Sequence, residues 1–166
     1  MVGTMRPRFF LRRGIPRTES ARGFTLIELL IVVSVLAVLL GIGVPSFRSI
    51  IAGQRIKNAS FEVYAALVLA RSEAINRNAT VTITPAGGNW TNGWTVASGA
   101  SVIRRQDTYP NITINGPVSI GFNAMGRMTG AAAQQISLAA TGTDSPAFRC
   151  VSIDLSGRPT TKNGTC

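Results

Sequence analysis

The chain has 166 residues and a formal net charge of +10, with seventeen basic side chains, seven acidic ones and no histidine. This length allows one modest domain together with a membrane segment, but not two full domains. The lack of histidine removes the commonest general base and the commonest transition-metal ligand.

Half of the net charge lies before residue 24. Residues 1–23 hold six arginines and one glutamate. Basic residues in front of a membrane span keep their side in the cytoplasm. We therefore expect a cytoplasmic N-terminus, with the residues after about 48 on the other side of the membrane.

A long apolar run follows, in which Glu28 is the only ionisable residue between Arg22 and Arg48. A helix over 24–47 would be about 36 Å long, enough to cross a bilayer core of about 30 Å, so we expect a single transmembrane helix there. An ordinary secretory signal is shorter and ends in small residues, unlike this run. A carboxylate at the centre of a span costs about 2.5–3.5 kcal/mol, and less near an end, so Glu28 is a functional candidate that needs a cationic partner. The plainer alternative is that Glu28 lies near the lipid headgroups and contacts nothing.

The letters "RGFTLIELLIVV" (22–33) resemble the class III signal of type IV filament subunits, the type IV pilins and type II secretion pseudopilins. The resemblance implies that a prepilin peptidase cuts after Gly23 and methylates Phe24, so that residues 1–23 are a cleaved leader. It also implies assembly with other pilins or pseudopilins through this helix. The new amine of one subunit would then pair with Glu28 of its neighbour and set the axial register, because a buried charge is tolerated only when paired.

The helix is predicted to continue beyond the membrane as an amphipathic half over 48–78. Apolar residues recur at the three- and four-residue spacing of one helical face, at positions 56, 59, 63, 66/67, 70 and 74. One helix over about 25–77 follows. Pro45 should bend or loosen it. The resemblance implies that this zone can lose helicity as subunits pack, and a simple kink is the alternative.

Residues 79–166 change to short β-rich runs separated by turns. We expect six or seven strands in one or two small antiparallel sheets, folded against the amphipathic half-helix as an α+β head, and no internal repeat. The runs are 79–84, 93–98, 101–106, 111–115, 118–123, 135–140 and 148–155.

Three stretches of this region are similar, in order, to the GspH/FimT/FimU group of minor pilins and pseudopilins. They read "WTNGWTV" (90–96), "IGFNAMGRMTG" (120–130) and "RCVSIDLSGRPT" (149–160). The resemblance implies a type IV pilin-like fold. It also implies a minor subunit, made in the inner membrane with its head in the periplasm, that joins a periplasmic or surface filament for protein secretion or pilus biogenesis. Trp90 and Trp94 are interpreted as core or hairpin packing rather than as a ligand site.

Two cysteines, Cys150 and Cys166, lie close to the C-terminus. A disulfide between them is permitted outside the cytoplasm, and it would close a loop of about 16 residues worth roughly 3 kcal/mol. Free thiols or an intermolecular bond are the alternatives.

No catalytic, metal or cofactor site is expected. The acidic residues beyond the apolar run form no close pair suited to acid–base chemistry, no histidine can activate a nucleophile, and the cysteines lack metal-binding spacing. We therefore interpret the protein as the substrate of an enzyme and not as an enzyme.

Two other functions remain open. Some FimT-type subunits bind DNA through a C-terminal Gly-Arg-x-Arg element, which here reads "GRPTTK" (157–162) and lacks the second arginine. Arg158 and Lys162 are therefore possible but not favoured DNA contacts, in a basic patch completed by Arg104, Arg105, Arg127 and Arg149. The other possibility is a simple single-span membrane-anchored protein without a filament partner.

Overall fold

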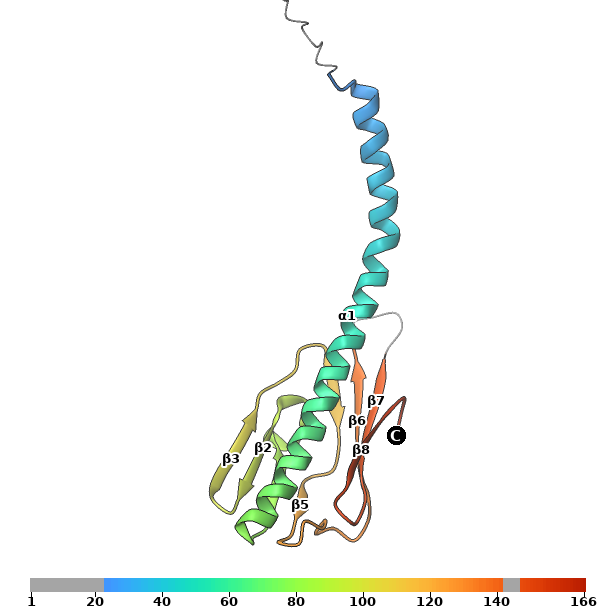
Figure 1. Cartoon of the computed structure of the whole chain (residues 1–166). Coiled ribbons are helices and arrows are strands. Elements are labelled where there is room, and N and C mark those ends of the chain that lie inside the picture. The colour runs from blue at the N-terminus through green and yellow to red at the C-terminus, as the bar shows by residue number, and fades with distance from the viewer. Residues whose placement is uncertain (1–22, 142–146) are drawn as a thin grey trace, which may run out of the picture. The chain divides into compact units, whose positions relative to one another are not determined.

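A computed structural model of the chain describes residues 23–141 and 147–166, so that most of the predicted leader and the acidic residue Asp144 lie outside the described residues. The chain divides into two compact units, Met1–Leu39 and Leu40–Cys166. The described residues form one long helix and eight strands in two four-stranded antiparallel sheets (Figure 1). The fold is therefore α+β, as the sequence predicts.

Helix α1 (Leu26–Arg77) is assigned without interruption, so Pro45 does not end it. The helix finishes where Asn78 adopts a positive φ of 48°. The Asn78 amide donates to the carbonyl of Ile75, and the Ala79 amide donates to that of Ala74. This is the Schellman arrangement, which satisfies the last carbonyls of a helix.

The C-terminal half of α1 packs on the sheets through the face that the sequence predicts. All of the expected positions are buried: Ile56, Ala59, Val63, Ala66, Leu67, Ala70 and Ala74. Four of them are alanines, whose small side chains let the strands approach the helix closely. This part of α1 lies across both sheets (Figure 1).

The first sheet has the strand order β3-β2-β1-β5. Its strands are β1 (Val81–Pro85), β2 (Trp94–Ser98), β3 (Ser101–Gln106) and β5 (Ile120–Phe122). Side chains alternate between the core and the surface along β1 and β2. Two 3₁₀ turns, Ala86–Gly88 and Trp90–Asn92, connect these two strands.

The second sheet has the order β4-β6-β7-β8. Its strands are β4 (Ile112–Asn115), β6 (Gln134–Ala140), β7 (Phe148–Ile153) and β8 (Pro159–Asn163). All seven strand regions expected from the sequence form strands, and their ends differ from the expected ones by at most two residues. Strand β8 is an addition that the sequence analysis missed, because this edge strand begins with proline and exposes its remaining side chains.

The expectation of no internal repeat is wrong. Residues 120–129 ("IGFNAMGRMT") and 151–160 ("VSIDLSGRPT") form two hairpins of the same design. Phe122 bridges to Met128 in the first, and Ile153 pairs with Pro159 in the second. The first, third, seventh and ninth positions are buried in both. The repeat is hard to recognise in the sequence because only the glycine, the arginine and the final threonine are identical between the two segments.

Candidate functional site

The predicted processing point lies in non-helical backbone just before α1. Gly23 has open space around it, and Phe24 is 84% exposed. Helix α1 begins two residues later, at Leu26. The Gly23–Phe24 bond is therefore accessible within the described residues, as a peptidase substrate has to be.

Glu28 has local partners that the sequence analysis did not assign to it. The Thr25 amide and hydroxyl each donate a hydrogen bond to Glu28 Oε2, at 3.1 and 3.2 Å, and the Glu28 amide donates to Thr25 Oγ1 at 3.3 Å. This reciprocal arrangement is a capping box, with Thr25 as the N-cap and Glu28 three residues into the helix. Glu28 therefore has contacts within its own chain, and its pairing with a neighbouring subunit stays a prediction. The Thr-x-x-Glu spacing was the signal in the sequence that could have revealed the capping box.

The first turns of α1 are apolar and unpacked. Every leucine, isoleucine and valine from Leu26 to Leu39 is between 50 and 77% exposed. Among the described residues, no helix meets the length and apolarity required to cross a membrane. The transmembrane helix expected over residues 24–47 stays a prediction.

A second apolar stripe runs along α1 on the face opposite the buried one. Its exposed members are Phe47, Ile51, Phe61, Val68 and Ile75. The intervals between them are sums of the three- and four-residue steps that keep residues on one helical face. Phe47, Ile51, Phe61 and Val68 are available to another molecule, whereas Ile75 also lies against Gly126.

Trp90 and Trp94 belong to the core, as predicted. Both are buried, their ring centroids are 5.9 Å apart, and the Trp90 indole donates to the Pro117 carbonyl at 2.7 Å. Tyr109 stacks on Trp94 with centroids 6.0 Å apart. Burial, helped by the charge of Glu62, raises the pKa of Tyr109 to about 12.

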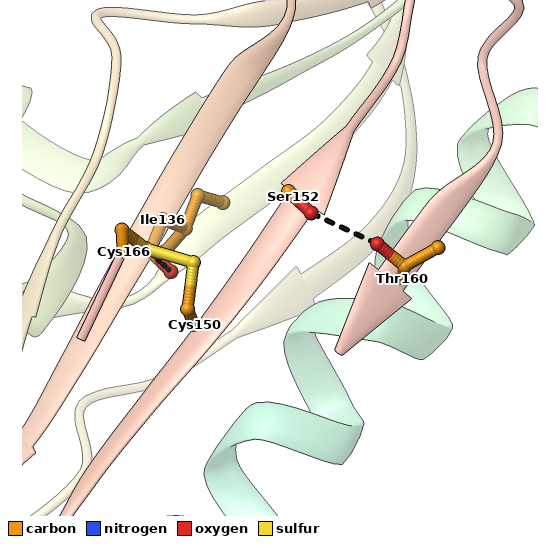
Figure 2. Close-up of a disulfide and its surroundings, with 5 residues drawn as sticks. All are labelled: Ile136, Cys150, Ser152, Thr160 and Cys166. Atoms are coloured by element: carbon orange, nitrogen blue, oxygen red, sulfur yellow. Dashed lines mark hydrogen bonds between the residues drawn. A yellow bond between two sulfur atoms is a disulfide. The ribbon is translucent and has the colours of Figure 1, made fainter. Parts of the chain in front are cut away.

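Cys150 and Cys166 form a disulfide (Figure 2), with Cα atoms 5.0 Å apart. The alternatives of free thiols or an intermolecular bond are therefore wrong. Cys150 is buried in β7, while the Cys166 sulfur lies 3.5 Å from the Ile136 carbonyl of β6. The Ser152 hydroxyl of β7 and the Thr160 hydroxyl of the neighbouring β8 hydrogen-bond at 2.8 Å. The disulfide thus fastens the chain end to the middle of the second sheet.

The basic residues considered for DNA contact are spread over both sheets. Arg104 and Arg105 lie on β3, at the edge of the first sheet, and Arg104 is paired with Glu62 of α1 at 2.8 Å. Arg149 lies on β7 and Lys162 on β8. Arg127 and Arg158 follow the glycines of the two repeated hairpins. The fold therefore does not gather the six residues on one element.

Comparison with known families decides the class of the protein. Residues 59–157 match the model of the type II transport protein GspH, and residues 20–44 match the prokaryotic N-terminal methylation motif. The chain belongs to the GspH family. This GspH-family chain is therefore a minor pilin or pseudopilin of a type IV filament system, a class of structural subunits and not an enzyme family. A comparison with curated protein sequences finds no significant match.

Solved structures share the fold of this GspH-family chain. The minor pilin FimU of Pseudomonas aeruginosa superposes with a TM-score of 0.57 at 23% identity, covering 68% of this chain and 96% of FimU. The minor pseudopilin EpsH of Vibrio cholerae superposes with a TM-score of 0.53 at 12% identity, covering 66% of this chain and 97% of EpsH. The type IV pilin-like fold is thereby confirmed.

Proposed function

We propose that this GspH-family protein is processed after Gly23, methylated on Phe24, and assembled through the apolar start of α1 into the filament of a secretion system or a type IV pilus. The observation that carries the proposal is the set of apolar side chains from Leu26 to Leu39, all of them half or more exposed. A helix that is apolar all round has to be buried in a membrane or in protein.

Packing against the helices of other subunits supplies that burial. Fully burying one leucine, isoleucine or valine side chain is worth about 1.5–3 kcal/mol, and eleven such residues lie between Leu26 and Leu39. Apolar packing alone is non-directional and tolerates shifts along the helix axis. A single polar group at a fixed position removes this freedom, as it does in coiled coils.

Glu28 is suited to setting the register because its carboxylate is already oriented. Thr25 holds Oε2 through the capping box. An ionised carboxylate has about four acceptor sites, so it can keep these bonds and still accept from the cationic amine of Phe24 in a neighbouring subunit. A Glu28 that is already hydrogen-bonded also costs less to desolvate than a free carboxylate.

Before assembly, we place the protein in the inner membrane as a single-pass protein with residues 1–23 in the cytoplasm. The basic leader supports this orientation. The Cys150–Cys166 disulfide supports a periplasmic C-terminal unit, because disulfides persist in oxidising compartments. The partners are then a prepilin peptidase with methyltransferase activity and other subunits of the filament.

The decisive test is the intact mass of the protein recovered from its native membrane. We expect a chain that begins at methylated Phe24 and lacks two hydrogens because of the disulfide. A chain that still carries residues 1–23 would remove the proposal and leave a simple anchored protein. Replacing Gly23 by a bulky residue is the matching variant, and it should block trimming.

Assembly is tested separately with Glu28→Val, which preserves the apolar helix. We expect this variant to be trimmed normally but to be absent from the filament fraction. Normal incorporation would contradict the role of Glu28 in register. Leu36→Val is the matched control, because it changes the same helix without touching a polar group, and it should be both trimmed and incorporated.

A further inference from the structure

The two repeated hairpins end in turns that are each held by one side-chain oxygen, Oδ1 of Asn123 or of Asp154. In the first, the amides of Met125 and Arg127 donate to Asn123 Oδ1, each at 3.0 Å. In the second, Asp154 Oδ1 accepts from the Ser156 hydroxyl at 2.6 Å and from the Arg158 amide at 3.0 Å. The glycine amide of each turn also donates to the carbonyl three residues earlier. Asn123 and Asp154 therefore hold the two backbones in one conformation.

The two turns touch each other through their glycines. A Cβ on Gly157 would collide with the carbonyl oxygen of Gly126, and a Cβ on Gly126 would collide with Ile75 of α1. Both glycines have a positive φ, of 81° and 70°. The Gly126 carbonyl also accepts a hydrogen bond from Arg71 Nε at 3.0 Å. Close packing and these bonds make the pair of turns one rigid unit.

This rigid unit carries one arginine directly after each glycine. Arg127 and Arg158 are both exposed, and within the described residues neither has a carboxylate at salt-bridge distance. Consecutive Cα atoms are about 3.8 Å apart, so each arginine starts one residue from the point at which the turns meet. Asp154 attracts the charge of Arg158 without forming a salt bridge with it. Two guanidinium groups outside salt bridges, on adjacent turns, are suited to binding one anionic partner.

Apolar side chains accompany the two arginines. Met125 is 80% exposed in the first turn, and Leu155 is exposed in the second. Methionine and arginine are enriched in protein–protein interfaces, where arginine is a frequent energetic hot spot. The two turns contain no aromatic residue on which a nucleic-acid base could stack. This composition favours a protein partner over a nucleic acid.

We propose that Arg127 and Arg158, with Met125 and Leu155, form a docking surface, the twin-turn surface, for an acidic protein that presents carboxylates beside apolar side chains. The inference rests on the proposed function, because the partner we infer is another subunit of the same filament. From residue 40 onward the chain has eleven basic and five acidic residues, so an acidic partner is electrostatically complementary. The turns lie at the end of the C-terminal unit where α1 finishes (Figure 1).

The test is site-specific photocrosslinking in cells, with a benzophenone amino acid in place of Met125. The same amino acid in place of Val102, which is exposed on β3, is the position control. Each probe is combined with the double variant Arg127→Gln/Arg158→Gln, or with Arg105→Gln as the charge control. Thermal unfolding of each variant shows whether the C-terminal unit is intact.

We expect the Met125 probe to give an adduct with another filament subunit, and mass spectrometry to place the link beside aspartate or glutamate. The double variant should lower its yield by at least about tenfold, because each arginine is a candidate hot spot, while Arg105→Gln should leave it unchanged. Exchanging the charges, with Arg127→Glu/Arg158→Glu in this chain and lysines in the partner, should restore the adduct.

Three results would overturn the inference. They are a nucleic-acid adduct at Met125, a yield that the folded double variant does not change, and a protein adduct no stronger than that of the Val102 probe. The N-terminal mass is measured on the same samples. A correctly trimmed chain with any of these results leaves the proposed function standing, whereas an untrimmed chain contradicts the proposed function itself.

Discussion

The two halves of α1 have the same secondary structure and opposite surroundings. From Leu26 to Leu39 the apolar side chains are exposed, whereas from Ile56 to Ala74 one face is buried under two sheets. Helix formation is therefore not what distinguishes them. The second half buries one face inside its own chain, whereas the apolar side chains of the first half have no such burial within the described residues. The stability of the C-terminal unit should accordingly be insensitive to the first half.

The largest effect that separates the two halves is expected from leucine truncation. Leu67→Ala removes a fully buried side chain and should lower the free energy of unfolding by about 2–5 kcal/mol. Leu36→Ala, the matched change in the exposed half, should leave it unchanged. Chemical denaturation of the full chain in detergent, followed by tryptophan fluorescence, measures both. Equal losses would show that the two halves unfold as one unit and would break the comparison.

The next effect concerns the stability that the C-terminal unit derives from its own crosslink. The disulfide closes a 16-residue separation, so its loss should cost about 3 kcal/mol by the chain-entropy model. Cys166→Ser is preferable to a change at Cys150, because Cys166 is exposed and Cys150 is buried. Its denaturation midpoint should match that of the reduced wild-type protein and should not respond to reductant. A midpoint equal to that of the oxidised protein would contradict the role assigned to the bond.

A smaller effect is expected at the start of the exposed half. Thr25→Ala removes the N-cap hydroxyl, which should cost about 1 kcal/mol of local helix stability. Amide exchange at Glu28 should quicken, while the unfolding midpoint of the C-terminal unit stays constant. Thr25→Ser keeps the hydroxyl and serves as the control. Faster exchange in both variants would mean that the hydroxyl is not the group that matters.

The smallest effect is expected on acid stability, from a substitution that makes one repeated turn more like the other. Hydrogen bonds from Ser156 and Arg158 hold the pKa of Asp154 below its ordinary value of 3.8. A folded-state pKa below the unfolded one adds stability that is present above the unfolded value and lost as the pH falls through the folded one. Asp154→Asn introduces the residue type that the first turn has at the equivalent position, Asn123. It should lower the free energy of unfolding slightly near pH 7, because the charge of Asp154 no longer strengthens these bonds, and it should remove part of the loss below about pH 4. An unchanged acid profile would show that Asp154 does not contribute.

Periodicity was enough to predict the α+β class, the extent of α1 and its buried face, because burial of one helical face requires the spacing seen from Ile56 to Ala74. Strand β8 was not predicted because an exposed edge strand has no apolar alternation. The capping box and the contact between the two repeated turns were not predicted for another reason. They depend on the positions of individual atoms, Glu28 Oε2 and the Gly126 carbonyl oxygen, which a hydropathy pattern does not contain.

The packing of α1 also decides how the protein bears mechanical load. The buried positions from Ile56 to Ala74 cover about 27 Å of helix. A pull on the N-terminus along the helix axis therefore strains these contacts in parallel, in shear, and does not peel them apart one at a time. Single-molecule stretching from the N-terminus should extract α1 in one abrupt event, and a series of small steps would contradict this. A helix held in this way can pass a pulling force to the sheets without losing its contacts one by one.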